Sequence, residues 1–386
     1  MSPPKLFLLA GEFPPEPGGV SDHTRLLAEV LVSFGIGPVV LCGGSAGPSR
    51  EWGVRVHRVA GGFGPLRWPA MARVLEGGAG RRAVWVQYAP HSMGMRGMNL
   101  PLALWLAWRA WFHGDRLVVY FHEVAFPFRG PWRHRLLSVA QNLMAGIVAA
   151  SASVALVTTQ AWLPRLAALG VRPSAVKLLP VFSNLPEEVN PGAVEARRAR
   201  WLAETGADRL VAHFGTYGGG VAALMVNTLA AFPRHSRAVF LLLGRQAAAW
   251  LASHAREPWA LRCRVVNETD SMALAETLAA CDAALQPYPD GVTTRRTTVM
   301  SALALGVPVV SNLGPLSDRC WAAESPCAGL APRPDGEKLA GELAGLLNRQ
   351  PSERANLGTR GRAWYRQSAS RAVAAQAVAG IVADLA

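Results

Sequence analysis

The chain has 386 residues, which is too long for one ordinary hydrophobic core and suits two domains. Because 51% of the residues are hydrophobic and only 17% are charged, the composition excludes a disordered chain. The net charge of +13 comes almost entirely from scattered arginines, which favours GC-rich codon usage over a nucleic-acid-binding patch and leaves a surface attracted to anionic lipid or an anionic ligand.

The N-terminal stretch contains one lysine and a five-residue apolar run, too short for the hydrophobic region of a signal peptide. We therefore expect a first strand there and a cytoplasmic protein. Five scattered cysteines without a CxxC pair argue against a disulfide framework and against a zinc site.

Short apolar runs then alternate with helical patterns, and they fall into two series. The first series predicts strands at residues 6–10, 38–42, 83–87, 117–121, 155–158 and 176–180. The second predicts strands at 210–214, 238–243, 263–266, 283–286 and 308–311. Strands of this type, buried on both faces, indicate parallel sheets. The sequence thus predicts an α/β protein with two doubly wound, Rossmann-like domains facing across a cleft, with ligands outside the carboxyl ends of the strands.

A segment rich in Pro and Asn, residues 179–192, ends the first series. It places the domain boundary so that one domain covers 1–180 and the other 181–367. The last segment, 368–386, is an Ala/Val-rich helix that we expect to return to the first domain.

Two apolar segments raise the question of a membrane. No charged residue lies between Arg135 and Arg165, a stretch long enough to span a bilayer, but its Gln, Asn, Ser and Thr residues favour a buried helix followed by a buried strand. The tryptophan-rich segment 98–114 has arginines in and beside it. It suits either a basic amphipathic helix on a bilayer surface or a buried helix that lines a cleft.

Two motifs follow strands of the first domain. Gly18 and Gly19 precede a helix predicted at 21–34, where glycine permits close backbone approach and the helix N-terminus favours an anion. A tight strand–helix turn is the alternative. His122 and Glu123 follow strand 117–121. The histidine could donate to a sugar hydroxyl or carry a proton, with the glutamate orienting it or binding an acceptor, or the ring could simply be satisfied at a strand end.

The second domain repeats this arrangement. Thr216 and the glycines around it end strand 210–214 and could line a cleft, although the segment is neither a P-loop nor a complete dinucleotide fingerprint. Arg245 ends strand 238–243, where it faces either a phosphate or solvent.

The segment 288–311 carries the densest set of candidate residues. Asp290 and Gly291 make a turn after strand 283–286. Hydroxyls and guanidiniums then gather before an uncharged helix: Thr293, Thr294, Arg295, Arg296, Thr297 and Thr298. This combination suits a diphosphate at a helix N-terminus; the alternative is an ordinary capped helix with exposed arginines.

Taken in order, these residues resemble the retaining glycosyltransferases of family 4, which have the GT-B fold. The resemblance runs from the Gly18–Gly19 loop through His122 and Glu123 to segments 178–186, 213–218 and 282–311, the last being the most specific. It implies a hexosyltransferase that moves a sugar from a nucleotide-diphosphate sugar to an acceptor, with retention at the anomeric carbon. It also implies a nucleotide held by the C-terminal domain, an acceptor held mainly by the N-terminal domain, Asp290 beside the donor sugar, and no metal or other cofactor.

The chain departs from the family pattern at two places. The family usually carries two glutamates eight positions apart in this block, where this sequence has Thr293 and Ser301. An Arg/Lys pair usually follows the first strand of the C-terminal domain and is missing here. We infer that Arg295 or Arg296 substitutes for that pair, with Arg245 as a further candidate.

Two other functions remain open. One is a sugar-nucleotide epimerase on the same fold; a pyridoxal-phosphate phosphorylase would need a Schiff-base lysine, and none of the three lysines has a convincing context. The other is a non-catalytic, nucleotide-sugar-binding relative, which the missing glutamate supports. The acceptor is open among a glycan, a lipid-linked molecule and a small molecule, with peripheral contact to an anionic inner membrane face as an option and no nucleic acid as a partner.

Overall fold

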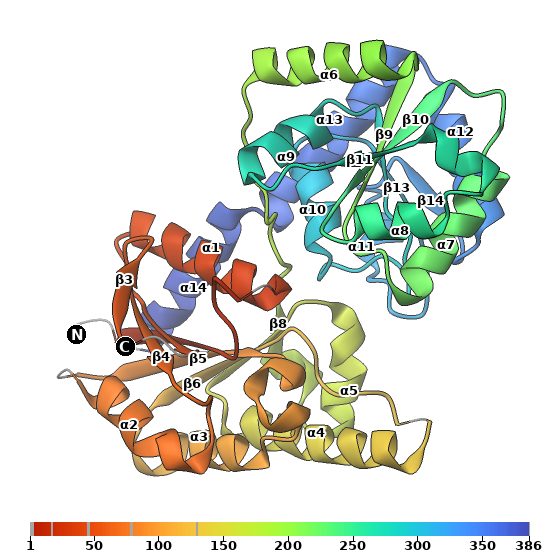
Figure 1. Cartoon of the computed structure of the whole chain (residues 1–386). Coiled ribbons are helices and arrows are strands. Elements are labelled where there is room, and N and C mark those ends of the chain that lie inside the picture. Colours follow the sequence, from red (N-terminus) through yellow and green to blue (C-terminus); the bar gives the residue numbers. More distant parts are fainter. Residues whose placement is uncertain (1–3, 17, 45–46, 78–79, 129, 386) are drawn as a thin grey trace. The chain divides into compact units, whose positions relative to one another are not determined.

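The computed structural model describes residues 4–16, 18–44, 47–77, 80–128 and 130–385 (Figure 1). The chain divides into two compact units. Unit 1 combines residues 1–180 with 371–386, and unit 2 covers 181–370, against expected boundaries at 180 and 367.

Unit 1 is built on one sheet in the order β3-β4-β2-β1-β5-β6-β7-β8. Its strands are β1 (Lys5–Ala10), β2 (Val39–Gly43), β3 (Ser49–Glu51), β4 (Val54–Val59), β5 (Arg82–Tyr88), β6 (Arg116–Phe121), β7 (Val154–Val157) and β8 (Val176–Leu178). All neighbours pair in parallel except β3, which runs antiparallel to β4 at the sheet edge. The expectation of purely parallel strands is therefore wrong at this edge, and the sequence did not predict β3 or β4.

Helices cover both faces of this sheet (Figure 1). One face carries α1 (Gly19–Ser33) and α14 (Arg371–Asp384), so the C-terminal helix packs within unit 1. The opposite face carries α2 (Trp68–Glu76), α3 (Leu100–Phe112) and α4 (Trp132–Ser151). The unit also contains α5 (Leu163–Ala168) and short 3-10 turns at η1 (Pro65–Arg67), η2 (Pro90–Met93), η3 (Met95–Gly97), η4 (Gln160–Trp162) and η5 (Pro173–Ala175).

The two apolar segments fold as α3, and as α4 followed by β7. Neither helix is fully buried: Trp111 on α3 is 62% exposed and Leu136 on α4 is 54% exposed. The expectation of a buried helix after Arg135, and the buried alternative for segment 98–114, are corrected to half-buried helices with apolar outer faces. Within the described part of the chain, no helix combines the length and the apolar character needed to cross a bilayer.

Unit 2 is built on a wholly parallel sheet in the order β11-β10-β9-β12-β13-β14. Its strands are β9 (Arg209–Phe214), β10 (Ala238–Leu243), β11 (Cys263–Val266), β12 (Ala283–Leu285), β13 (Val309–Asn312) and β14 (Gly329–Ala331). Its helices are α6 (Pro191–Thr205), α7 (Gly219–Ala231), α8 (Ala247–Ser253), α9 (Ser271–Ala279), α10 (Thr297–Ala304), α11 (Cys320–Ala323), α12 (Gly336–Leu347) and α13 (Pro351–Ser368), with one 3-10 turn, η6 (Pro258–Arg262).

One buried carboxylate fixes β12 beside β9 in unit 2. Asp282 accepts hydrogen bonds from the backbone N–H of Leu210 (2.9 Å) and from the guanidiniums of Arg198 (3.0 Å) and Arg354 (3.2 Å). The backbone N–H of Asp282 in turn donates to the carbonyl of Leu210 (2.8 Å). Because a buried charge is stable only when it is paired, these bonds hold the start of β12 in one register against β9.

Candidate functional site

The sheet of unit 2 changes direction between β9 and β12. From β9 the chain builds outward through β10 and β11, and it then returns to place β12 on the other side of β9. In open parallel sheets, ligands bind outside the carboxyl ends of the strands at such a switch point. A cavity of about 180 Å³ lies there, lined by His213, Phe214, Gly215, Thr216, Val221, Gln286, Tyr288, Arg295, Arg296, Thr297 and Thr298. Its volume is below the roughly 300–1,000 Å³ of a complete small-molecule site, so it suits one part of a larger ligand.

Two guanidiniums stand at this cavity. Arg295 and Arg296 lie in the turn just before α10, and both bind the carboxylate of Asp290, at 2.9 Å and 2.5 Å from Nη2 to the nearest Oδ. All three side chains are about one-fifth to one-quarter exposed, since the exposed fractions are 19%, 24% and 25%. Two guanidiniums thus stand at the cavity, and guanidiniums are the groups that pair best with the oxygens of a phosphate.

An aromatic ring orients Arg296. Its guanidinium lies 4.3 Å from the ring centroid of Tyr288, a cation–π contact. The Tyr288 hydroxyl lies 2.9 Å from Oγ1 of Thr298, the second residue of α10. Burial raises the pKa of Tyr288, although Arg296 opposes the shift, so this phenol stays protonated at neutral pH. Tyr288 therefore links the guanidinium to the start of the helix.

Gln286 is a polar side chain that our sequence reasoning missed, although it stands in an otherwise apolar strand end. It is 1% exposed, and its Oε1 lies 3.4 Å from the Tyr288 hydroxyl. Its Nε2 is buried and has no hydrogen-bond partner among the described residues. A buried amide without a partner is costly, so a ligand acceptor in the cavity would stabilise it.

His213 also lines the cavity and was not predicted as a site residue. Its Nδ1 lies 2.9 Å from the carbonyl oxygen of Leu285, so the ring bridges β9 and β12 at their carboxyl ends. Burial lowers the pKa of His213, which makes the neutral ring the stable form. We interpret His213 as a structural residue that holds the ends of β9 and β12 together at the cavity wall.

The expected diphosphate residues divide into two groups. Thr216, Arg295, Arg296, Thr297 and Thr298 line the cavity. The others do not, and the structure gives three of them structural contacts.

Those structural contacts hold the loop between β12 and α10. The backbone N–H and Oγ1 of Thr294 both bind Oδ2 of Asp318, at 2.6 Å and 3.1 Å. Gly291 has φ +89°, and a Cβ there would lie 2.3 Å from the backbone nitrogen of Gly314. Thr293 is fully buried, and its carbonyl oxygen accepts a hydrogen bond from the backbone N–H of Arg296 (3.2 Å). Gly291, Thr293 and Thr294 therefore shape the loop that presents the arginines.

Arg245 and Ser301 lie outside the lining of the cavity. Arg245 follows β10 and is exposed, outside the cavity wall. Ser301, at the position of the second family glutamate, is fully buried, with its Oγ 3.0 Å from both Ser183 Oγ and Asn184 Oδ1. The serine thus joins α10 to the segment that precedes α6 through two hydrogen bonds.

In unit 1, Gly18 and Gly19 lie at the start of α1. A Cβ on Gly18 would stand 2.1 Å from Oε1 of Glu12, so a larger residue there would require the Glu12 side chain to move. Burial raises the pKa of Glu12, while a hydrogen bond from the backbone of Ser21 opposes the shift. A carboxyl group of the chain itself therefore occupies the helix N-terminus, where an external anion would have to compete with it.

His122 and Glu123 follow β6, as expected. The His122 ring is 8% exposed, and its Nε2 lies 2.6 Å from Oε1 of Gln87. Burial lowers the pKa of His122 to about 3, so the imidazole is neutral near pH 7. Of the two expected roles, hydrogen bonding to a hydroxyl suits a neutral ring, whereas carrying a proton as imidazolium does not. Glu123 is half-buried beside it.

The described residues include no group of three or more His, Cys, Asp and Glu side chains placed to hold a metal ion. The cationic groups at the cavity are guanidiniums.

Comparison with known proteins gives one family match and many structural ones. Residues 18–182 match the family described as "Glycosyl transferase 4-like domain". No curated protein sequence matches the chain.

Three solved structures illustrate the structural likeness. Sucrose-phosphate synthase from Thermosynechococcus elongatus has a TM-score of 0.74 at 16% identity, with 99% of each chain covered. Anabaena Alr3699/HepE in complex with UDP-glucose has a TM-score of 0.69 at 16% identity, covering 98% of this chain and 99% of that one. WaaG, a glycosyltransferase involved in lipopolysaccharide biosynthesis, has a TM-score of 0.67 at 15% identity with the same coverage. The chain has the GT-B fold of these structures, and with the domain match this supports a glycosyltransferase.

Because the His122 ring is buried, we expect it to stay neutral over the pH range in which an exposed histidine titrates. Because burial lowers its pKa to about 3, the ring resonances should not shift between pH 5 and pH 8. Nitrogen-detected NMR of histidine-labelled protein measures this, and the His122→Gln variant assigns the resonance by its disappearance. A His122 titration midpoint between pH 5 and pH 8 would contradict a buried neutral ring.

Proposed function

We propose that the chain is a retaining hexosyltransferase that moves a sugar from a nucleotide-diphosphate sugar to an acceptor in the cytoplasm, without a metal ion. The observation that carries this proposal is the cavity at the β9–β12 switch point of unit 2. It brings two arginines, three threonines and the start of α10 to one cavity of about 180 Å³.

The diphosphate is the part of the donor that fits this cavity. Arg295 and Arg296 supply forked N–H donors, which match phosphate oxygens in pairs. The first backbone N–H groups of α10, at Thr297 and Thr298, have no partner within their helix and carry the positive end of its dipole. The amide of Gln286 adds a donor from the strand side. As the bond to the sugar breaks, negative charge grows on the departing phosphate, and these fixed donors stabilise it.

Two adjacent guanidiniums also supply the positive charge that a divalent cation provides in other phosphate sites. This is the basis for proposing a metal-independent reaction.

Asp290 is proposed to change partners when the donor binds. Its carboxylate now holds Arg295 and Arg296, and a diphosphate that pairs with those arginines would release it. A released carboxylate beside the diphosphate is placed to accept hydrogen bonds from hydroxyls of the donor sugar. In unit 1 we assign neutral His122 a hydrogen bond to a sugar hydroxyl and Glu123 a contact with the acceptor. We assign no nucleophile.

The first donor to test is a uridine diphosphate sugar, since Anabaena Alr3699/HepE was solved with UDP-glucose and with UDP. GDP- and ADP-sugars follow in the same series.

Removing both guanidiniums should weaken donor binding. In the Arg295→Ala/Arg296→Ala variant we expect a loss of about 2 kcal/mol or more, the scale of hydrogen bonds to charged groups. Isothermal titration calorimetry with each nucleotide sugar measures this and identifies the base.

The matched control removes two exposed arginines of the same unit, in the variant Arg256→Ala/Arg349→Ala. It should bind as the wild type does. Equal weakening in both double variants would mean that net charge, and not this cavity, attracts the donor. Wild-type protein that binds none of the nucleotide sugars would refute the proposal.

The reaction should retain the anomeric configuration and tolerate removal of divalent cations. Proton NMR of the first product formed reports the configuration through its anomeric coupling, and the same assay with excess EDTA should keep its rate. An inverted product, or activity lost with EDTA and restored by a divalent cation, would contradict these two features. Conversion of the nucleotide sugar without any acceptor would indicate an epimerase, and binding without turnover would indicate a non-catalytic relative.

A further inference from the structure

Unit 1 carries a set of exposed apolar side chains that neither the core nor the proposed reaction uses. They lie on α3, on α4 and on the turn η1, and α3 packs along α4 on one side of the sheet. We call this set the tryptophan face: Leu66, Leu104, Trp108, Trp111, Phe112, Trp132, Leu136, Val139 and Leu143, with exposed fractions from 44% for Trp108 to 93% for Leu66.

The spacing of these residues shows that they form stripes on two helices. On α4, Trp132, Leu136, Val139 and Leu143 recur at intervals of four, three and four residues, which is one face of a helix. On α3, positions 104, 108, 111 and 112 follow the same rule. Both helices bury their opposite faces in unit 1. A helix on the surface of a soluble domain normally presents a polar outer face. Exposed apolar stripes of this kind therefore indicate an interaction surface.

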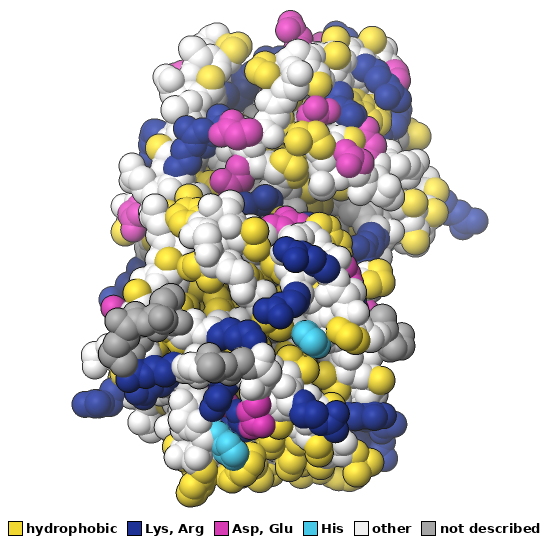
Figure 2. All heavy atoms as spheres, turned by 90° about the vertical axis from the view of Figure 1, so that its left-hand side faces the viewer, with side chains coloured by type: hydrophobic (Ala, Val, Ile, Leu, Met, Phe, Trp, Pro, Cys, Tyr) yellow, Lys and Arg dark blue, Asp and Glu magenta, His cyan; other side chains and the backbone are white. Residues whose placement is uncertain are grey.

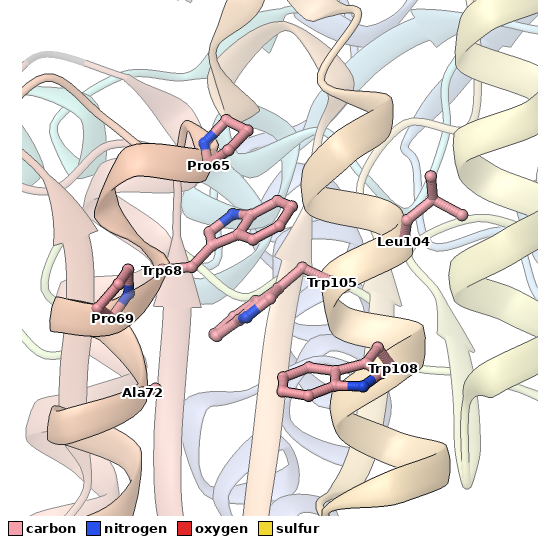
Figure 3. Close-up of a pocket in the computed structure, with 7 residues that line it drawn as sticks. All are labelled: Pro65, Trp68, Pro69, Ala72, Leu104, Trp105 and Trp108. Carbon is pink, nitrogen blue, oxygen red and sulfur yellow. The ribbon is translucent and has the colours of Figure 1, made fainter.

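A groove between α2 and α3 continues this face. It has a volume of about 540 Å³ and is lined by Pro65, Trp68, Pro69, Ala72, Leu104, Trp105 and Trp108 (Figure 3). The rings of Trp68 and Trp105 stack with their centroids 6.1 Å apart. The lining offers almost no hydrogen-bonding groups beyond the indole N–H, so the groove suits hydrocarbon better than a sugar, which would need polar partners.

The part of the chain that carries the tryptophan face is rich in positive charge. Residues 61–175 contain twelve arginines and only three acidic residues, Glu76, Asp115 and Glu123. Asp115 pairs with Arg82 and with Arg109 (2.7 Å), and Arg109 also binds Glu76 (2.5 Å), so two of the three acids are balanced by two of the arginines and ten arginines remain against Glu123. In Figure 2 hydrophobic side chains fill the lower edge of the molecule, and Lys and Arg side chains lie above them.

Exposed arginines stand directly beside the apolar residues. Arg67 adjoins Leu66 on η1, and Arg73 lies on α2. The guanidinium of Arg133 lies 5.5 Å from the ring centroid of Trp132. An apolar surface with tryptophans, rimmed by arginines, is complementary to a bilayer whose headgroups are anionic and whose acyl chains lie just beneath.

We propose that unit 1 binds the surface of an anionic lipid bilayer through the tryptophan face. The stripes of α3 and α4 enter the boundary between headgroups and acyl chains, the groove between α2 and α3 takes up hydrocarbon, and the arginines of the rim pair with lipid phosphates. This inference stands on unit 1 alone and does not depend on the donor site of unit 2.

The test is binding to vesicles of phosphatidylcholine, with and without phosphatidylglycerol, measured by co-sedimentation. The full chain should bind the mixed vesicles and bind the neutral vesicles much more weakly. The Trp111→Glu/Phe112→Glu variant should bind the mixed vesicles at least tenfold more weakly, because two exposed rings are replaced by charges that anionic lipid repels.

The control is Leu261→Glu/Met272→Glu, which places the same two charges at exposed apolar residues of unit 2, with 77% and 41% exposure. It should bind as the wild type does. Far-ultraviolet circular dichroism and thermal unfolding verify that each variant is folded. Blue-shifted tryptophan fluorescence on vesicle addition, lost in the double variant, would support insertion of the face.

Three outcomes would overturn the proposal. The first is wild-type protein that does not bind the mixed vesicles. The second is binding that the double variant retains, which would place the contact on the basic residues alone. The third is a dimer that the double variant dissociates, with no vesicle binding, which would make a second copy of the chain the occupant of this face.

Discussion

The adjacency of β9 and β12 is the constraint on which the candidate site depends. Asp282 ties the starts of these strands together, and the bond from His213 to the carbonyl of Leu285 ties their carboxyl ends. Because β10 and β11 lie on the other side of β9, the sheet opens at this point, and the two strand ends bring Thr216 and Tyr288 to one cavity. Residues about seventy positions apart in the chain thereby meet at this cavity.

The carboxylate of Asp290 is the anion that pairs with the two arginines of this cavity. Asp290 neutralises part of the charge of Arg295 and Arg296 and holds both guanidiniums in place without a ligand. In the proposed function, a diphosphate would displace Asp290 from the arginines, because it carries more charge than one carboxylate and offers more acceptors. Asp290 would then be available to hydroxyls of the donor sugar while the diphosphate is bound. The proposal therefore gives Asp290 two roles, one before and one after the donor binds.

Much of the fold could be predicted because buried parallel strands are continuous apolar runs. The eleven predicted strands appear with ends shifted by one or two residues at most, as at β5, where 83–87 becomes Arg82–Tyr88. The strands β3, β4 and β14 were missed. β3 and β14 have only three residues each and lie at sheet edges, and β4, next to β3, reads VRVHRV and alternates polar residues with apolar ones. The apolar stripe of α4 was interpreted as a buried surface because the helix has no charged residue after Arg135, and apolar residues that face the core or the outside give the same pattern in the sequence.

The site was predictable only in part. The sequence identifies Arg295 and Arg296 as cations before a helix, but it does not reveal that Asp290 binds both. Thr293 and Thr294 were indistinguishable from Thr297 and Thr298 in the sequence, since only the loop geometry directs the first pair inward. Gln286 and His213 line the cavity because β12 lies next to β9 in the sheet. The order of strands in a sheet cannot be derived from a local sequence pattern.

The most direct test of the account is a crystal structure with the nucleotide sugar that calorimetry selects. We expect both phosphates in the cavity between β9 and β12, with Arg295 and Arg296 within hydrogen-bond distance of their oxygens and Asp290 released from at least one guanidinium. A diphosphate bound elsewhere, or arginines that stay paired with Asp290 while the donor is bound, would contradict the account.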